Sequence, residues 1–149
     1  MPGKRRRSGG KKQVSIAQCA ALPVAVRDGE TMAMLVTSRT GRRWVLPKGG
    51  IEDGMEPHET AARRAFEAAG LVGTAERAPI GFFSCGKQAS GGRSARKAGV
   101  FLMHVDRQES DWPERGQRET CWFSLAGAAM AADDGELVAL LLRMAAPAA

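Results

Sequence analysis

The feature that most constrains this chain is a glycine-rich turn followed by a short amphipathic segment, within residues 46–71. Gly49 and Gly50 open the turn. Pro57 suits the first turn of a helix because its missing N–H group needs no partner there. Apolar residues then recur at helical spacing, and Gly70 can supply the left-handed conformation that ends a helix. The pattern predicts a loop joined to a helix that buries one stripe and exposes the other.

Length and charge distribution predict one folded domain preceded by a basic arm. The chain has 149 residues, which is within the usual range for a single domain. Residues 1–12 contain six of the 22 basic residues and no acid, which leaves 16 basic against 16 acidic residues elsewhere. We expect a disordered arm at residues 1–12 and a single domain at residues 13–149. The arm either solubilises the chain or contacts RNA and other polyanions weakly.

Cysteine usage and hydropathy bear on the compartment. Cys19, Cys85 and Cys121 are widely spaced and form no C-x-x-C pair, which argues against a disulfide framework and a zinc knuckle. No stretch approaches the roughly 18 apolar residues that span a bilayer. We therefore expect a cytoplasmic protein with no membrane partner.

The remaining patterns predict an α+β fold in which helices enclose a mixed sheet. A D-G turn at residues 28–29 favours a hairpin, and a loop rich in Gly, Ser and Lys is expected at residues 86–98. The expected strands are 14–26, 32–36, 43–46, 80–84, 100–105 and 120–123, and the expected helices are 57–69 and 134–145, with an apolar segment at 125–132.

The polar face of the predicted middle helix carries the residues of chemical interest. Positions 64, 67 and 68 are three and four apart and so should project together toward the glycine turn. They hold Arg64, Glu67 and Ala68. The segment resembles the Nudix box, G-x5-E-x7-R-E-U-x-E-E-x-G-U, where U is a bulky aliphatic residue. Arg64 and Ala68 replace two glutamates of that pattern, and Met55 replaces a third.

The resemblance extends over approximately residues 17–145. It is closest to the diphosphoinositol polyphosphate and diadenosine polyphosphate branch of the Nudix hydrolases, because residues 44–50 match a W-x-x-P-x-G-G motif and residues 111–123 resemble a D-W…W-F motif. The resemblance implies an α/β/α sandwich with a mixed central sheet. It also implies hydrolysis of a phosphoanhydride in a nucleoside or inositol compound.

In that family, helix carboxylates and a loop carbonyl gather Mg²⁺ or Mn²⁺, which activates water for attack. The resemblance therefore implies particular roles for residues of this chain. The implied metal ligands are Glu67, Glu52 and the backbone of Gly49 and Gly50; the implied phosphate-binding residues are Lys48, Arg64 and Lys87; the implied catalytic residues are Glu67 and a base, Glu114 or Glu119.

Three functions remain open at this point. The chain is a metal-dependent hydrolase, or a binding protein that recognises an anionic phosphate ligand through Lys48 and Arg64, or a nucleic-acid module that uses its basic arm. Arg64 either pairs with Glu67 or holds a phosphate with its planar fork. Glu59, Arg63 and Glu67 also have the spacing of an ordinary ion-pair ladder.

Overall fold

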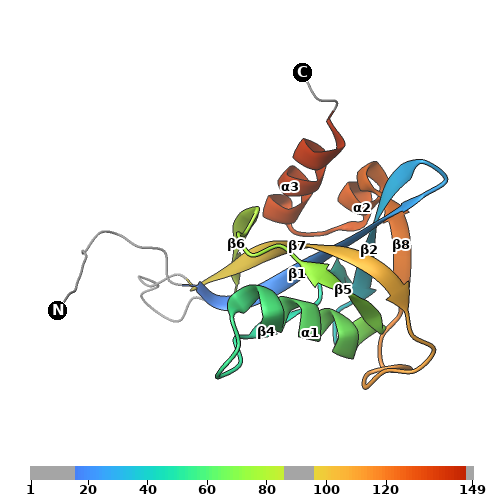
Figure 1. The fold of residues 1–149 in the computed structure, drawn as a ribbon. Helices are drawn as coiled ribbons and strands as arrows, with labels where there is room; N and C mark the ends of the chain where they lie inside the picture. The colour runs from blue at the N-terminus through green and yellow to red at the C-terminus, as the bar shows by residue number, and fades with distance from the viewer. Residues whose placement is uncertain (1–15, 86–95, 147–149) are drawn as a thin grey trace.

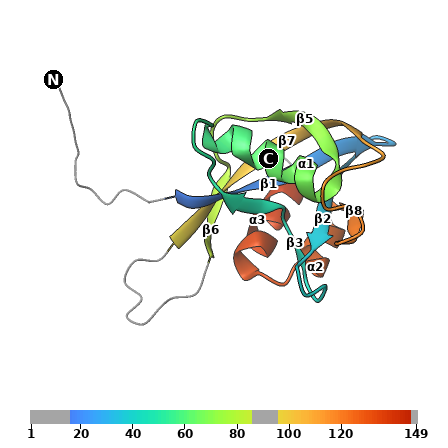
Figure 2. The same ribbon diagram turned by 90° about the horizontal axis from the view of Figure 1, so that it is seen from below.

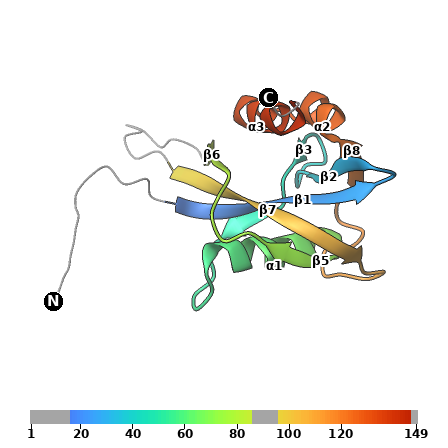
Figure 3. The same ribbon diagram turned by 45° about the horizontal axis from the view of Figure 1, so that its top comes forward.

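The computed structural model describes residues 16–85 and 96–146, which form one eight-stranded mixed sheet with helices on both faces (Figure 1). Helix α1 covers one face, and α2 and α3 cover the other (Figure 3). The predicted α+β class is confirmed. The strands are β1 (Ile16–Arg27), β2 (Glu30–Thr37), β3 (Trp44–Val45), β4 (Lys48–Gly50), β5 (Leu71–Ala75), β6 (Gly81–Cys85), β7 (Arg96–Gln108) and β8 (Thr120–Ser124), and the helices are α1 (Pro57–Ala69), α2 (Leu125–Ala131) and α3 (Gly135–Ala145).

Two long parallel strands, β1 and β7, form the centre of the sheet. Strand β2 pairs antiparallel with β1, and β5 and β6 pair antiparallel with β7. Side chains of β1 alternate between the two faces, as in any strand. Cys19 and Ala21 pack in the core under α1, whereas Ala20 and Leu22 pack in the core under α2 and α3. This two-sided burial explains why the middle of β1 is apolar without interruption.

Local signals define the ends of α1. Pro57 is its first residue, and Gly70 caps its C-terminus with a φ angle of 73°. Glu59 does not form the expected ladder with Arg63. Its carboxylate instead accepts a hydrogen bond from the Glu56 amide at 2.9 Å, as in a capping box. This bond is favoured over an ion pair with Arg63 because an unpaired N–H group at a helix start needs an acceptor.

The structure differs from the sequence expectations at three other places. Lys48–Gly50, expected to be loop, is strand β4 and pairs with β1. Strand β5 was not expected. Residues 96–98, expected to be loop, begin β7, and residues 86–95 lie outside the described residues, as does the predicted arm at residues 1–12.

The view from below shows α1 lying across the sheet, with the chain running from β4 through residues 51–56, here called the box loop, into the helix (Figure 2). No helix in the described part of the chain is both long enough and apolar enough to cross a membrane.

Candidate functional site

Strand β4 separates the two halves of the site. Gly49 pairs with Cys19 of β1, and a Cβ atom on Gly49 would lie 2.5 Å from Arg64 Nε, so this position faces α1. Because neighbouring positions of a strand face opposite ways, the Lys48 side chain points to the other face of the sheet. Lys48 and Arg64, both predicted to bind phosphate, therefore reach β4 from opposite sides.

The Arg64 guanidinium connects helix α1 to the box loop. Its Nη2 donates a hydrogen bond to the Gly50 carbonyl at 2.8 Å, and its Nη1 donates to Glu67 Oε1 at 3.0 Å. Nη2 also lies 3.8 Å from Glu52 Oε2. The side chain is only 20% exposed. The pairing with Glu67, one of the two roles left open by the sequence, is therefore present.

Both carboxylate oxygens of Glu67 face arginines. Oε1 accepts from Arg64, and Oε2 lies 3.3 Å from Nε of Arg63. Arg63 Nε is also 3.7 Å from Glu52 Oε1. Two arginines and two glutamates thus form one cluster beside the box loop. Its net charge is zero, and neither oxygen of Glu67 is left without a cation.

Position 68 does not share this polar surface. Ala68 is 5% exposed and packs in the core between α1 and the sheet, together with Ala61, Ala65 and Leu71. The sequence had placed positions 64, 67 and 68 together on the polar face of the helix. The difference arises because Ala61, Ala65 and Ala68 recur at i, i+4 and i+7, so position 68 belongs to the stripe of α1 that packs on the sheet.

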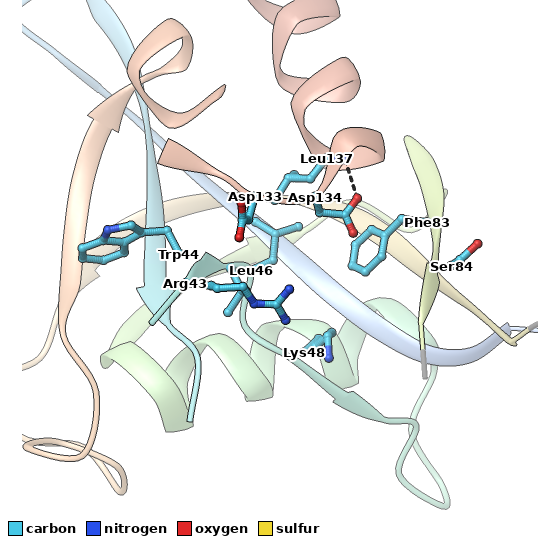
Figure 4. A pocket seen from close by; sticks show the side chains of 10 residues that line it. Arg43, Trp44, Leu46, Lys48, Phe83, Ser84, Asp133, Asp134 and Leu137 are labelled. Atoms are coloured by element: carbon cyan, nitrogen blue, oxygen red, sulfur yellow. Dashed lines mark hydrogen bonds between the residues drawn. The ribbon is translucent and has the colours of Figure 1, made fainter. Parts of the chain in front are cut away.

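A cavity of about 250 Å³ lies on the opposite face of β4, between that strand, β6 and the start of α3 (Figure 4). Lys48 points into it. The sequence did not indicate the other charged residues there, because they are distant along the chain and the Asp-Asp pair suggested only a helix start. The lining residues are Arg43, Trp44, Val45, Leu46, Lys48, Phe83, Ser84, Asp133, Asp134 and Leu137.

The family of the chain follows from comparison with known domains. The family model of the NUDIX domain matches residues 18–141, which is most of the chain. The chain belongs to the Nudix family. The Nudix fold is also seen in the crystal structure of C. elegans Ap4A hydrolase, which superposes with a TM-score of 0.65 at 18% identity and covers 89% of this chain and 97% of that one.

Curated Nudix relatives have a higher percentage of identical residues over the aligned part of the chain. Nudix hydrolase 12, mitochondrial, of Arabidopsis thaliana is 32% identical over 96 residues, covering 62% of this chain and 47% of the relative. Diphosphoinositol polyphosphate phosphohydrolase 3-alpha of Mus musculus is 29% identical over 104 residues, covering 68% and 59%. The chain thus spans about half the length of the curated relatives it matches.

The Nudix box of this chain does not offer a free set of metal ligands. Of the ligands implied by the sequence, the Gly50 carbonyl and both oxygens of Glu67 already accept from arginines. Among residues 16–85 and 96–146, no three acidic, histidine or cysteine side chains gather where they could hold a metal ion. While Arg64 keeps this position, the carbonyl and carboxylate oxygens of the box suit a guanidinium. They do not fit Mg²⁺ or Mn²⁺, which require several free oxygen ligands.

The two glutamates considered as bases have other contacts. The Glu114 amide donates to the Glu67 carbonyl at 2.9 Å, but its carboxylate pairs with Arg118 Nε at 3.0 Å. Glu119 is exposed, and its amide donates to the Thr37 hydroxyl. Neither carboxylate contacts the box cluster in the described part of the chain. Lys87, the third residue implied for phosphate binding, lies outside the described residues.

The Cys19 thiol of β1 contacts the backbone of β4. It donates weakly to the Gly49 carbonyl at 3.7 Å. Burial raises its pKa from 9.0 to about 11, and the positive charge of Arg64 offsets part of this rise. The folded protein therefore holds this proton more tightly than the unfolded chain does.

The free energy of unfolding should consequently fall as the pH rises from about 9 to about 11, and this contribution should be fully present below pH 9. The Cys19→Ala variant should lose that part of the slope. Denaturant titrations of both proteins across this range measure the difference. Equal slopes in the two proteins would show that the thiol does not titrate in this way.

Proposed function

We propose that this protein binds a small molecule that contains a diphosphate linkage, and that the guanidinium of Arg64 is the cation that holds the diphosphate. The observation that carries the proposal is the position of Arg64 between the Gly50 carbonyl and Glu67. In the family pattern this helix position is a glutamate, and charge on the phosphate is balanced by a divalent metal ion. Here a fixed positive charge replaces a carboxylate.

The geometry of Arg64 leaves donors for a ligand. A guanidinium has five N–H groups, of which the bonds to Gly50 and Glu67 use two. Nε of Arg64 is buried and has no partner among the described residues, so the donors left for a ligand are the remaining N–H groups of Nη1 and Nη2. Planar guanidinium groups bind phosphate through paired hydrogen bonds, which are about twice as strong as bonds between neutral groups. Glu52, at 3.8 Å, is a loose competitor that a diphosphate oxygen can displace.

Gly49 should be essential for this arrangement. A Cβ at Gly49 would lie 2.5 Å from Nε and 2.9 Å from Cδ of Arg64, whereas a Cβ at Gly50 would meet nothing within 4 Å. Gly49→Ala should therefore push Arg64 from the loop and weaken diphosphate binding by about tenfold, a loss equivalent to one net hydrogen bond. Gly50→Ala is the matched control and should bind normally. Equal affinities of the two variants, measured by calorimetry, would contradict the prediction.

Hydrolysis of the same linkage is the second candidate function. The relatives named above are hydrolases, and Glu67 keeps the first position of the family's acid pair. For Glu67 to serve as a metal ligand or a base, Arg63 or Arg64 must first leave it. This candidate retains the sequence-derived roles for Mg²⁺ or Mn²⁺ at Glu67 and Glu52, for Lys87 at the phosphates, and for Glu114 or Glu119 as base.

Binding and turnover assays separate the two functions. Calorimetric titration with pyrophosphate and with ADP in EDTA measures metal-free binding, and release of phosphate or nucleotide in Mg²⁺ measures hydrolysis. Our proposal predicts binding in EDTA with little or no turnover in Mg²⁺. Mg²⁺-dependent turnover without any binding in EDTA would establish the second function instead.

The basic arm at residues 1–12 is proposed to add a weak contact with polyanions. Removing it should lower the affinity for RNA and flatten the salt dependence of binding, because each neutralised phosphate contributes to that slope. An unchanged salt dependence after removal would rule out this role.

A further inference from the structure

Residues 109–119, which connect β7 to β8, hold the last turn of α1, where Glu67 lies. The final carbonyl groups of a helix have no partner within it and need one elsewhere. Here the Glu114 amide donates to the Glu67 carbonyl at 2.9 Å, and the Glu109 amide donates to the Gly70 carbonyl at 2.8 Å. The backbone of Glu67 is therefore fixed from outside the helix.

Two side chains add to this contact. Gln108 Nε2 donates to the Ala69 carbonyl at 2.8 Å. The ring of Trp112 covers Gly70 so closely that a Cβ atom there would lie 2.8 Å from its Cδ2 atom. The connection between β7 and β8 is thus bound to the end of α1 through both backbone and side chains.

Arg118 fixes the other side of this connection to the sheet. Its Nε lies 3.0 Å from Glu114 Oε1, and its Nη1 donates to the carbonyl of Thr37, the last residue of β2, at 3.2 Å. The Glu119 amide donates to the Thr37 hydroxyl at 2.9 Å. The side chain of Arg118 is only 16% exposed and that of Glu114 29%, so their attraction is screened less than that of a surface ion pair.

The contacts form a continuous path from Arg118 to the box. Arg118 pairs with the Glu114 carboxylate, and the Glu114 amide holds the Glu67 carbonyl. Glu67 Oε1 then accepts from Arg64, which also donates to the Gly50 carbonyl. Helix ends fray where their last carbonyls lack partners, so loss of the Glu114 bond would free the backbone of Glu67 and with it the carboxylate.

We propose that Arg118 is a positioning residue for the diphosphate site: by holding Glu114, it keeps Glu67 where its carboxylate orients the Arg64 guanidinium. A guanidinium suits this task because its planar fork reaches two acceptors at once, here a carboxylate and a carbonyl. The inference rests on the proposed function for its effect on ligand affinity. Its effect on Arg64 in the free protein does not depend on any ligand.

The test compares Arg118→Met with the natural protein, first without ligand. Methionine keeps an apolar stem but has no donor. Nε of Arg64 is buried, so NMR can follow the exchange of its hydrogen with water, which reports local opening. Arg118→Met should speed this exchange by about tenfold, the factor for one net hydrogen bond, and should weaken pyrophosphate binding in EDTA by about three- to tenfold.

A double variant, Glu114→Leu with Arg118→Met, guards against misfolding of the single one. It removes both charges, so no unpaired carboxylate is left partly buried, and it should show the same two effects. Val24→Ala is the control for stability. It removes buried apolar groups on the opposite face of the sheet, and it should lower the free energy of unfolding without changing the Arg64 exchange.

Arg107→Gln is the matched control for charge. It breaks an ion pair with Glu109 in which the Arg107 side chain is 64% exposed, and it should change neither the exchange nor the affinity. Exchange of the Arg64 hydrogen at the natural rate in both Arg118 variants would overturn the inference. If pyrophosphate binds, an affinity unchanged in both would also overturn it. If the natural protein does not bind pyrophosphate while the Arg118 variants still release the Arg64 hydrogen, the proposed function fails and the positioning role stands.

Discussion

Arg64→Gln is expected to weaken pyrophosphate binding by about 10- to 100-fold, the range for losing a hydrogen bond to a charged group. Glutamine can still donate to the Gly50 carbonyl, but it carries no charge. The loss of the Arg64 charge also leaves Arg63 as the cation that balances Glu52 and Glu67 beside the ligand. Calorimetry in EDTA measures the change.

Arg63→Gln is the matched control. The Arg63 side chain is 53% exposed and contacts only carboxylates, so its removal should change affinity by about threefold or less, as for other exposed ion pairs. Arg64→Glu provides the opposite test. It should abolish binding in EDTA and create dependence on Mg²⁺, because two carboxylates and the Gly50 carbonyl then supply oxygen ligands. Wild-type affinity of Arg64→Gln in EDTA would refute the role of Arg64.

Ala68→Glu is expected to lower the free energy of unfolding by about 2–4 kcal/mol, because it buries a carboxylate without a partner. Ala68 is 5% exposed and lies in the core beside Ala65 and Leu71. Denaturation by urea measures the effect. Ala62→Glu, at a partly exposed position on the same helix, is the control and should cost about 0.5 kcal/mol or less.

This prediction bears on any attempt to restore the family pattern. Reintroducing the glutamate at position 68 together with Arg64→Glu should give a destabilised protein, and absence of activity in it would say little about the box. If Ala68→Glu is as stable as the natural protein, the new carboxylate reaches solvent at the box, and position 68 belongs to the site after all.

The sequence predicted best those elements whose signals are local. Helix α1 was expected at its observed bounds because Pro57 and Gly70 act within one turn of its ends. Strand β4 was missed because Lys-Gly-Gly has no apolar alternation, and it is extended only through pairing with β1. The start of β7 was missed for a related reason, since its pairing with β1 and β6 extends it beyond its apolar centre.

The site was predictable only as far as the box extends. The spacing placed Arg64 beside Glu67, but its bond to Gly50, 14 residues earlier, depends on the path of the loop. The cavity was not foreseen, because Arg43 and Asp133 are far apart along the chain and line the same cavity only once α3 packs on the sheet. Similarly, no local pattern showed that Lys48 and Arg64 would face opposite sides of β4.

The side-chain Nε–H NMR signal of Arg64, followed during titration with pyrophosphate in EDTA, distinguishes binding by Arg64 from binding by a divalent ion. If Arg64 binds the diphosphate, this signal should shift in a saturable way, and the shift should be absent in Gly49→Ala. An unmoved Arg64 signal, together with broadening of the Gly49 and Gly50 amide signals by Mn²⁺, would instead place a metal ion at the box.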